Sequence, residues 1–397
     1  MKSKILKEHK KDVPHIIKYM GSKRKILDFV MESISDVYSG GTVCDLFAGT
    51  SIISGALGAI VPVHSNDIQN YSSIFAKTYL SNFDKSKNPN LLVDQILTEA
   101  EENVRFFKSK YPIFNFEYTQ EIQFCDFIKI EKQEKELINY DFDVDFHLFT
   151  KYYSGTYWSY EQCLWIDSLV KVSRNFNGTG TYQIILASIM HAMSYTSQST
   201  GHFAQFRTTK DEDSMRDILS YRLKSFTHLF KNKFLQLYNF IDSNDFTHKI
   251  TNLDFSECLD VIEEGSVVYA DPPYASVHYS RFYHALETLV KYDYPEVKHK
   301  GRYRVDRHQS PFSRKSEAKK AFAIMFEKIS QKRSQLVLSY SNAGVITLDE
   351  ILDVAHLKFK NYTITTKYVD YKHSTMGRKF DKNVDVTEIL VIAKLNS

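Results

Sequence analysis

The chain has few of the residues and runs that mark several common protein classes. Its four cysteines stand far apart in 397 residues, and no pair has the spacing of zinc ligands. We therefore expect neither a disulfide scaffold nor a metal site, and the scattered thiols fit a reducing, cytoplasmic environment. No uncharged run is long enough to span a bilayer, and charged residues interrupt the first positions. Neither a membrane span nor a signal peptide is expected.

Two phosphate-binding motifs are also missing. The chain contains no G-x-G-x-x-G and no Gly-Lys-Ser/Thr loop. The net charge is only +3, which does not by itself indicate a nucleic-acid partner. Aromatic residues, in contrast, are abundant, with 26 Tyr and 28 Phe, which argues against disorder over most of the chain. These features indicate a folded globular protein whose ligand lacks a pyrophosphate group.

Strands and helices alternate in the first part of the chain. The pattern predicts a helix over 24–38, a strand over 42–46, a helix over 52–59, a strand over 61–66 and a helix ending near Leu80. This alternation is typical of a parallel, doubly wound sheet. We therefore predict an α/β fold with a mostly parallel sheet.

The alternation stops near Asn82 and resumes near Ile250. The region between is mostly helical in pattern, so we predict a split sheet-bearing domain, residues 1–82 and 246–397, with an inserted, mainly helical domain over 83–245. Near the end, two strand patterns, 362–371 and 384–394, flank Met376-Gly377-Arg378-Lys379. They predict an antiparallel hairpin at the edge of the sheet.

The run Asp271-Pro272-Pro273-Tyr274 follows an apolar strand over 266–270. Neither proline has an N–H group, so the strand ladder ends there and the turn is stiff. Such a turn presents one carboxylate, one carbonyl oxygen and one aromatic face. These groups suit a flat heterocycle with an exocyclic amine, and the alternative is an ordinary strand-to-loop turn.

A second set of residues lies at the ends of other predicted strands. The segment Asp45-Leu46-Phe47-Ala48-Gly49-Thr50 follows the first strand, where ligands of open α/β sheets bind, and Gly49 allows close backbone approach. Asp67 ends the next strand and can accept hydrogen bonds from ribose hydroxyls, or it can cap the following helix.

Two further segments complete this set. Asp254-Phe255 can accept from an adenine amine and stack on its ring, or it can be a plain loop pair. Upstream, Tyr19 offers a flat face, Gly21 a tight turn and Lys23 a cation, although a generic helix start is the alternative.

The order of these motifs resembles that of the Dam-type DNA adenine-N6 methyltransferases. In that family a Lys-Trp/Tyr-x-Gly-x-Lys segment precedes a Phe-x-Gly loop, and a target-recognition domain is inserted before Asp-Pro-Pro-Tyr. The resemblance covers roughly 14–80 and 249–345 and implies a class I methyltransferase fold. One departure is Ser51, where the family often has a second glycine.

The resemblance implies S-adenosylmethionine as the cofactor. With the reasoning above, the predicted cofactor contacts are Tyr19, Gly21, Lys23, Asp45, Phe47, Ala48, Gly49, Thr50, Asp67, Asp254, Phe255 and Asp271. It also implies that the target adenine lies between Asp271, Pro272 and Tyr274. Two acceptors, the Asp271 carboxylate and the Pro272 carbonyl, would point the lone pair of the amine at the methyl group, and no metal is needed.

The implied function is sequence-specific methylation of adenine N6 in double-stranded DNA after base flipping. The protein would be the modification part of a restriction-modification system, with a companion restriction endonuclease, or a solitary or phage methylase. Other substrates for the same chemistry are cytosine N4, an RNA adenine or a protein amide. A DNA-binding module with a degenerate site is the non-enzymatic alternative.

Contacts to DNA are predicted from basic and amide side chains. Arg281 and His284, directly after the catalytic turn, are expected to hold the flipped base or the adjoining phosphates. The basic stretch 298–307 predicts phosphate contacts by Lys300, Arg302, Arg304 and Arg307, or a solvated surface loop. In the middle region, Gln205 and Arg207 are of the types that read base edges.

Overall fold

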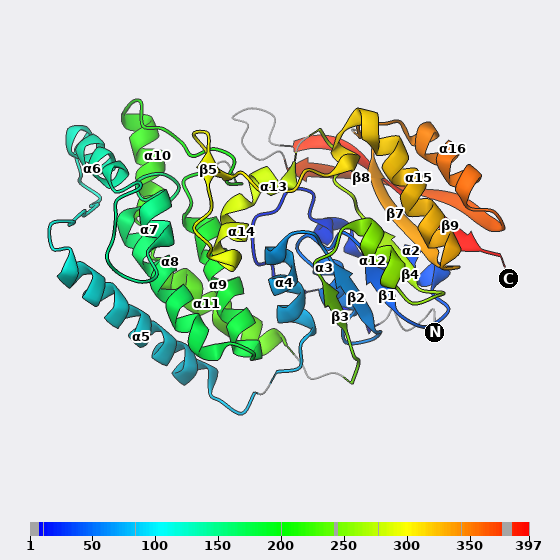
Figure 1. Cartoon of the computed structure of the whole chain (residues 1–397), viewed down its shortest axis with the longest axis horizontal. Coiled ribbons are helices and arrows are strands. Elements are labelled where there is room, and N and C mark those ends of the chain that lie inside the picture. Colours follow the sequence, from blue (N-terminus) through cyan, green and yellow to red (C-terminus); the bar gives the residue numbers. More distant parts are fainter. Residues whose placement is uncertain are drawn as a thin grey trace.

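The computed structural model describes residues 8–10, 12–83, 85–199, 201–241, 245–276, 278–342, 344–374 and 383–396 (Figure 1). Its central feature is a seven-stranded sheet with the order β3-β2-β1-β4-β7-β9-β8. The strands are β1 (Val43–Asp45), β2 (Val63–Asn66), β3 (Lys249–Thr251), β4 (Val267–Ala270), β7 (Gln335–Ser341), β8 (Tyr362–Ser374) and β9 (Asn383–Leu395). The predicted α/β fold with a mostly parallel sheet is confirmed.

The first five strands of this order run parallel, β9 runs opposite to them, and β8 runs in their direction again. β1 pairs in parallel with β2 and β4, β2 with β3, and β4 with β7. β9 is antiparallel to both β7 and β8. The connection that was expected to turn between the last two strands, Met376 to Lys379, lies outside the described residues.

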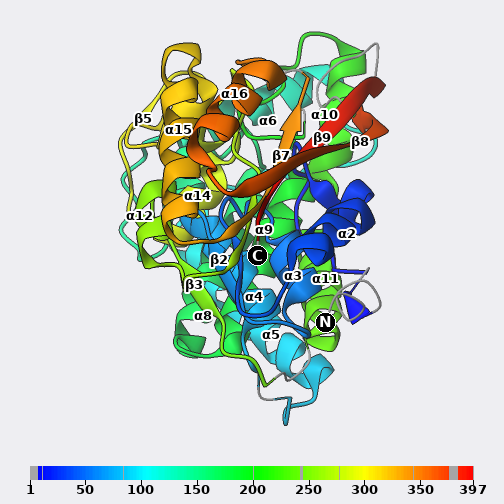
Figure 2. The same cartoon turned by 90° about the vertical axis from the view of Figure 1, so that its right-hand side faces the viewer.

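Helices cover both faces of the sheet, because neighbouring strand residues point to opposite sides. Val43 and Val267 belong to one buried cluster, which also contains residues of α2 (Leu27–Val37), α3 (Ile52–Leu57) and α4 (Asn70–Leu80). Cys44 and Val268 belong to a second cluster, which contains residues of α12 (Phe255–Val261), α15 (Lys315–Gln331) and α16 (Leu348–Lys358). Figure 2 shows α15 and α16 on one side of the strands and α2 and α3 on the other.

The region between α4 and β3 forms helices and contributes no described strand to the sheet. These are α5 (Pro89–Lys110), α6 (Phe124–Glu136), α7 (Leu148–Tyr153), α8 (Tyr160–Ser173), η2 (Arg174–Phe176), α9 (Gly180–Thr196), α10 (Glu212–Arg222) and α11 (Phe226–Phe240). They lie together to the left of the sheet in Figure 1. Their core is continuous with that of the sheet, because α9 packs against α4 and shares its apolar cluster.

Local sequence signals account for several helix starts. The side chain of Asn88 accepts from two backbone N–H groups of α5, and Pro89 occupies its first turn. Ser159 and Gln162 form a reciprocal capping box at the start of α8. Short elements follow the turn Asp271-Pro272-Pro273-Tyr274: α13 (Tyr279–Phe282), α14 (His284–Lys291), β5 (Val297–Lys298), β6 (Tyr303–Arg304) and η3 (Pro311–Ser313). In the part of the chain that the structure describes, no helix combines the length and apolarity needed to cross a bilayer.

Candidate active site

A cavity opens at the carboxyl ends of β1, β2 and β4. Ligands of parallel sheets bind at this edge. The lining includes every residue predicted for cofactor binding or catalysis: Tyr19, Gly21, Lys23, Asp45, Phe47, Ala48, Gly49, Thr50, Asp67, Asp254, Phe255, Asp271, Pro272 and Tyr274. Sequence reasoning did not assign other members of the lining, among them Tyr71, His278 and His308.

The loop after β1 is held open by its backbone. Gly49 has φ +52°, and a Cβ there would lie 3.0 Å from the hydroxyl oxygen of Tyr19. Ser51 also adopts a left-handed conformation, with φ 54°, although it carries a Cβ. The serine therefore takes the conformation that glycine would favour, at a cost of about 1–2 kcal/mol. The departure at Ser51 leaves the loop in a glycine-like path.

Asp67 ties this loop to the end of β2. Its Oδ2 accepts the N–H of Gly49 and its Oδ1 the N–H of Gln69, each at 2.8 Å. Burial raises the pKa of Asp67 to about 6, and the two backbone donors act against this rise. Each carboxylate oxygen keeps room for a further donor, such as a hydroxyl in the cavity.

Asp254 is the N-cap of α12 and not part of a plain loop pair. Its side chain caps α12 by accepting the N–H of Ser256 at 2.9 Å, and Glu257 reaches back to the N–H of Asp254. The same residue lines the cavity.

Three aromatic residues of the lining, Tyr19, Phe47 and Phe255, pack against other rings. Phe47 and Phe255 have ring centroids 6.2 Å apart, and Phe312 packs edge-on against both. Tyr19 stacks on Tyr283 with centroids 4.5 Å apart. Flat walls of this kind suit flat ring systems.

The carboxylate of Asp271 is paired with a buried lysine. Nζ of Lys23 lies 3.0 Å from Oδ1 of Asp271 and 2.7 Å from Oε1 of Glu388 in β9. Lys23 was predicted to offer a cation to the cofactor, whereas in the structure its ammonium contacts these two carboxylates. Burial raises the pKa of Asp271 to about 7; Lys23 opposes this rise and Glu388 adds to it. The sequence pointed to Glu388 only by placing a charge in an apolar strand.

Asp45 and Tyr274 have further partners beside the cavity. Oδ2 of Asp45 accepts the N–H of Ser54 at 3.2 Å and its hydroxyl at 2.7 Å, so this carboxylate anchors α3. Burial raises the pKa of Asp45 to about 7. The ring of Tyr274 packs against Tyr340, with centroids 5.1 Å apart, and Lys23 lies 5.7 Å from its centroid.

Two predicted DNA contacts are wrong because their side chains are buried. His284 is 1% exposed and its Nε2 lies 2.8 Å from the carbonyl oxygen of Phe203. Burial lowers its pKa to about 3, which keeps the ring neutral. The side chain of Arg304 is 2% exposed and is shared by the carboxylates of Asp293 and Asp306. Both side chains are buried and contact other parts of the protein, so neither is available to bind a phosphate.

The remaining predicted DNA contacts are more accessible. Lys300 and Gln205 are exposed. Arg281 lies over the ring of Tyr303, with Cζ 5.2 Å from its centroid. Arg302, Arg307 and Arg207 are half-buried. Arg302 lies over Tyr152, and Arg207 forms an ion pair with Asp217.

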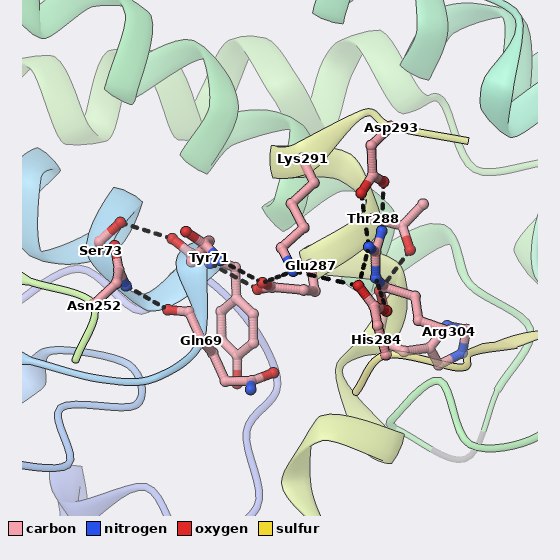
Figure 3. A network of polar contacts seen from close by, with 12 residues as sticks. Gln69, Tyr71, Ser73, Asn252, His284, Glu287, Thr288, Lys291, Asp293 and Arg304 are labelled. Carbon is pink, nitrogen blue, oxygen red and sulfur yellow. Dashed lines mark hydrogen bonds and ion pairs between the residues drawn. The ribbon is translucent and has the colours of Figure 1, made fainter. Parts of the chain in front are cut away.

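A polar network connects Arg304 and α14 to the start of α4, beside the cavity (Figure 3). Glu287 of α14 accepts from the side chain of Asn70 at 2.6 Å and from the N–H of Tyr71 at 3.3 Å, at the start of α4. Lys291 lies 3.3 Å from Glu287 and 3.8 Å from Asp306, a partner of Arg304. The buried arginine therefore supports the helix that follows Asp67 rather than a DNA phosphate.

The fold also brings together residues that sequence spacing kept apart. Cys44, His64 and Cys258 are fully buried, and their ligand atoms lie within 4.8 Å of one another. The prediction of no metal site, argued from cysteine spacing, overlooked this cluster. Nε2 of His64 already lies 2.9 Å from the hydroxyl oxygen of Thr251, so the ring has a partner within the protein.

The strand order and the position of the cavity are consistent with the class I methyltransferase fold. The sequence profile of the D12 class N6 adenine-specific DNA methyltransferases matches residues 19–161 and 175–343. The chain therefore belongs to this family.

Three similar curated proteins carry methylase names. The chain is 25% identical to modification methylase LlaI of Lactococcus lactis subsp. lactis, over 96% of this chain and 55% of that protein. It is 23% identical to modification methylase StsI of Streptococcus sanguinis, over 94% of this chain and 51% of that protein. It is 22% identical to type II methyltransferase M.NlaIII of Neisseria lactamica, over 89% of this chain and 92% of that protein. The chain thus spans about half the length of the first two relatives.

Proposed function

We propose that this protein is a sequence-specific DNA methyltransferase that transfers a methyl group from S-adenosylmethionine to adenine N6 in duplex DNA. The observation that carries the proposal is one cavity lined by both Asp271-Pro272-Pro273-Tyr274 and the Gly49–Asp67 pair. Family membership and the names of the relatives support the same reaction. Those names also support a place in a restriction-modification system, with a companion endonuclease as partner.

The residues of the cavity fit S-adenosylmethionine. The missing Cβ of Gly49 leaves space that a side chain would fill, and Asp67 presents oxygens to hydroxyl groups. Phe47 and Phe255 offer flat apolar surface for an adenine ring. When bound, the cofactor supplies an electrophilic methyl group on a positively charged sulfur.

The residues of the catalytic corner would orient the target amine. One N–H of the amine would donate to the Asp271 carboxylate and the other to the Pro272 carbonyl, which leaves the nitrogen lone pair pointing away from both. Tyr274 would stack on the base. As the nitrogen gains positive charge, Asp271 stabilises it electrostatically.

We also propose that residues 83–245 form the target-recognition domain and that residues 1–82 and 246–397 form the catalytic domain. The β5–β6 hairpin is fastened to this helical region, since the hydroxyl of Tyr303 donates to the carbonyl of Ala204 at 2.5 Å. The exposed Lys300 and Gln205 lie on these joined segments. Lys300, Arg302 and Arg307 remain candidates for phosphate contacts, and Arg281, Gln205 and Arg207 for contacts to the flipped base or to base edges.

Labelled S-adenosylmethionine incubated separately with duplex DNA, RNA and protein tests the proposed function. We expect label on N6 of adenine in duplex DNA, and Asp271→Ala should abolish it while cofactor binding is retained. Label only on cytosine, RNA or protein would overturn the assignment. Label on no substrate, from protein that binds the cofactor, would favour a degenerate site.

A further inference from the structure

One buried carboxylate that the proposed mechanism does not use is Glu388 of β9. Its side chain is 0% exposed. Its Oε1 accepts from Nζ of Lys23 at 2.7 Å and from the hydroxyl of Ser339. Its Oε2 is buried and has no hydrogen-bond partner in the described part of the chain. A buried carboxylate oxygen that accepts no hydrogen bond destabilises the folded protein, so its presence here needs an explanation.

The explanation lies in how the charges around Lys23 are shared. One ammonium stands between two carboxylates, because the same Nζ lies 3.0 Å from Oδ1 of Asp271. Lys23 is 4% exposed and the Asp271 side chain 21% exposed, so water screens this group of charges poorly. With all three groups ionised, one negative charge in the cluster has no matching cation.

The unmatched negative charge affects which group can accept the proton that the amine loses during methylation. The amine nitrogen gains a bond to the methyl carbon and must lose one proton, while the carbon–sulfur bond breaks and sulfur keeps its electron pair. Asp271 is the carboxylate at the catalytic corner. A carboxylate fully paired with a lysine would be a poor acceptor for this proton, since the ammonium stabilises its ionised form.

We propose that Glu388 is a positioning residue for Asp271: by sharing Lys23, it leaves the Asp271 carboxylate only partly neutralised and able to accept the proton released by the methylated amine. This inference rests on the proposed function. The unmatched charge also complements the positive sulfur of the cofactor. Burial raises the pKa of Asp271 to about 7, in agreement with this arrangement.

The groups that act on Asp271 come from several elements. Lys23 of η1 (Lys23–Ile26) favours the ionised carboxylate, whereas Glu388 of β9 and Asp45 of β1 disfavour it. The hydroxyls of Tyr269 and Tyr274 face the same cluster and stay neutral, because burial raises their pKa well above the usual value. Removing the charge of Glu388 should therefore make Asp271 more acidic.

The test is the pH dependence of single-turnover methyl transfer to duplex DNA at saturating cofactor. In Glu388→Gln the acid limb should move down by about one pH unit, and the plateau rate should fall about tenfold or more. Ser339→Ala is the matched control, because it removes a hydrogen bond to the same oxygen but no charge, and its acid limb should coincide with that of the wild type. A Glu388→Gln limb that coincides with the wild-type limb overturns the proposal.

A second measurement needs no turnover. Calorimetric titration with S-adenosylmethionine near neutral pH, in buffers of different ionisation enthalpy, should detect proton release, because the sulfonium drives Asp271 to ionise. Asp271→Asn keeps Asp45 and Asp67, whose pKa values burial also raises, and should release fewer protons than the wild type. S-adenosylhomocysteine, which lacks that charge, should release fewer protons. Equal release by both ligands overturns the proposal. A wild type that binds the cofactor but methylates no DNA defeats the proposed function instead.

Discussion

Nζ of Lys23, in the first described helical turn of the sheet-bearing region, lies 2.7 Å from Oε1 of Glu388, 365 residues further along the chain. The contact joins the segment before α2 to the antiparallel end of the sheet and sets the charge around Asp271. The surroundings of the proposed catalytic residue Asp271 are therefore assembled from both ends of the sequence.

Replacing Asp271 by Asn should change how stability depends on pH. The folded protein holds the Asp271 proton up to about pH 7, whereas an unfolded aspartate loses it near pH 4. The wild type therefore gains stability from this group at low pH and loses it as the pH rises. Between about pH 5 and pH 8 it should lose about 2–3 kcal/mol relative to Asp271→Asn.

Urea unfolding of both proteins at the two pH values measures this difference. Asp45 and Asp67 are present in both proteins, so their titration cancels to first order. A constant difference in unfolding free energy across the range would contradict the raised pKa of Asp271.

Adding a methyl group at Gly49 should weaken cofactor binding. In Gly49→Ala the Cβ meets the Tyr19 hydroxyl at 3.0 Å, and the backbone at φ +52° disfavours alanine. We expect an increase in Kd of about tenfold or more, equal to about 1.4 kcal/mol. Gly178→Ala is the matched control, because φ is +80° but its Cβ meets nothing within 4 Å. Calorimetry should show normal cofactor affinity in that control.

Ser51 should tolerate glycine but not valine. Glycine relieves the left-handed strain and loses only a 3.3 Å hydrogen bond from the serine hydroxyl to the carbonyl of Ser72. Ser51→Gly should therefore unfold within about 1 kcal/mol of the wild type. Ser51→Val, with a β-branched side chain at φ 54°, should lose about 1–3 kcal/mol. Equal thermal stability of the two variants would argue against the left-handed conformation.

Within the basic stretch 298–307, we expect Lys300 to contribute to DNA binding and Arg304 to contribute to stability. Lys300→Ala should leave the melting temperature nearly unchanged, weaken binding to all DNA sequences and reduce the salt slope by about one. Arg304→Ala should lower the unfolding free energy by about 1–3 kcal/mol, because the packing of its buried side chain and its hydrogen bonds to Asp293 and Asp306 are lost. Melting curves and a salt series of DNA binding measure both effects. A normal melting temperature in Arg304→Ala would contradict its structural role.

Residues at strand ends could be placed from the sequence because local chemistry fixes where strands stop. Asp45, Asp67 and Asp271 each follow an apolar strand, and the carboxyl ends of parallel strands meet at one edge. This rule explains why these three residues line the same cavity. His284 and Arg304 could not be placed in the same way, since a basic residue in a loop looks the same whether solvent or Asp293 surrounds it.

The sequence alone determined the α/β class, the mostly parallel sheet and the residues around the cavity, because strand periodicity and proline stops are local properties. Only the tertiary structure decided that Lys23 would stand between Asp271 and Glu388, and that Cys44, His64 and Cys258 would meet. Contacts between distant residues depend on how strands pair, and pairing is set by the packing of the whole chain rather than by any short segment.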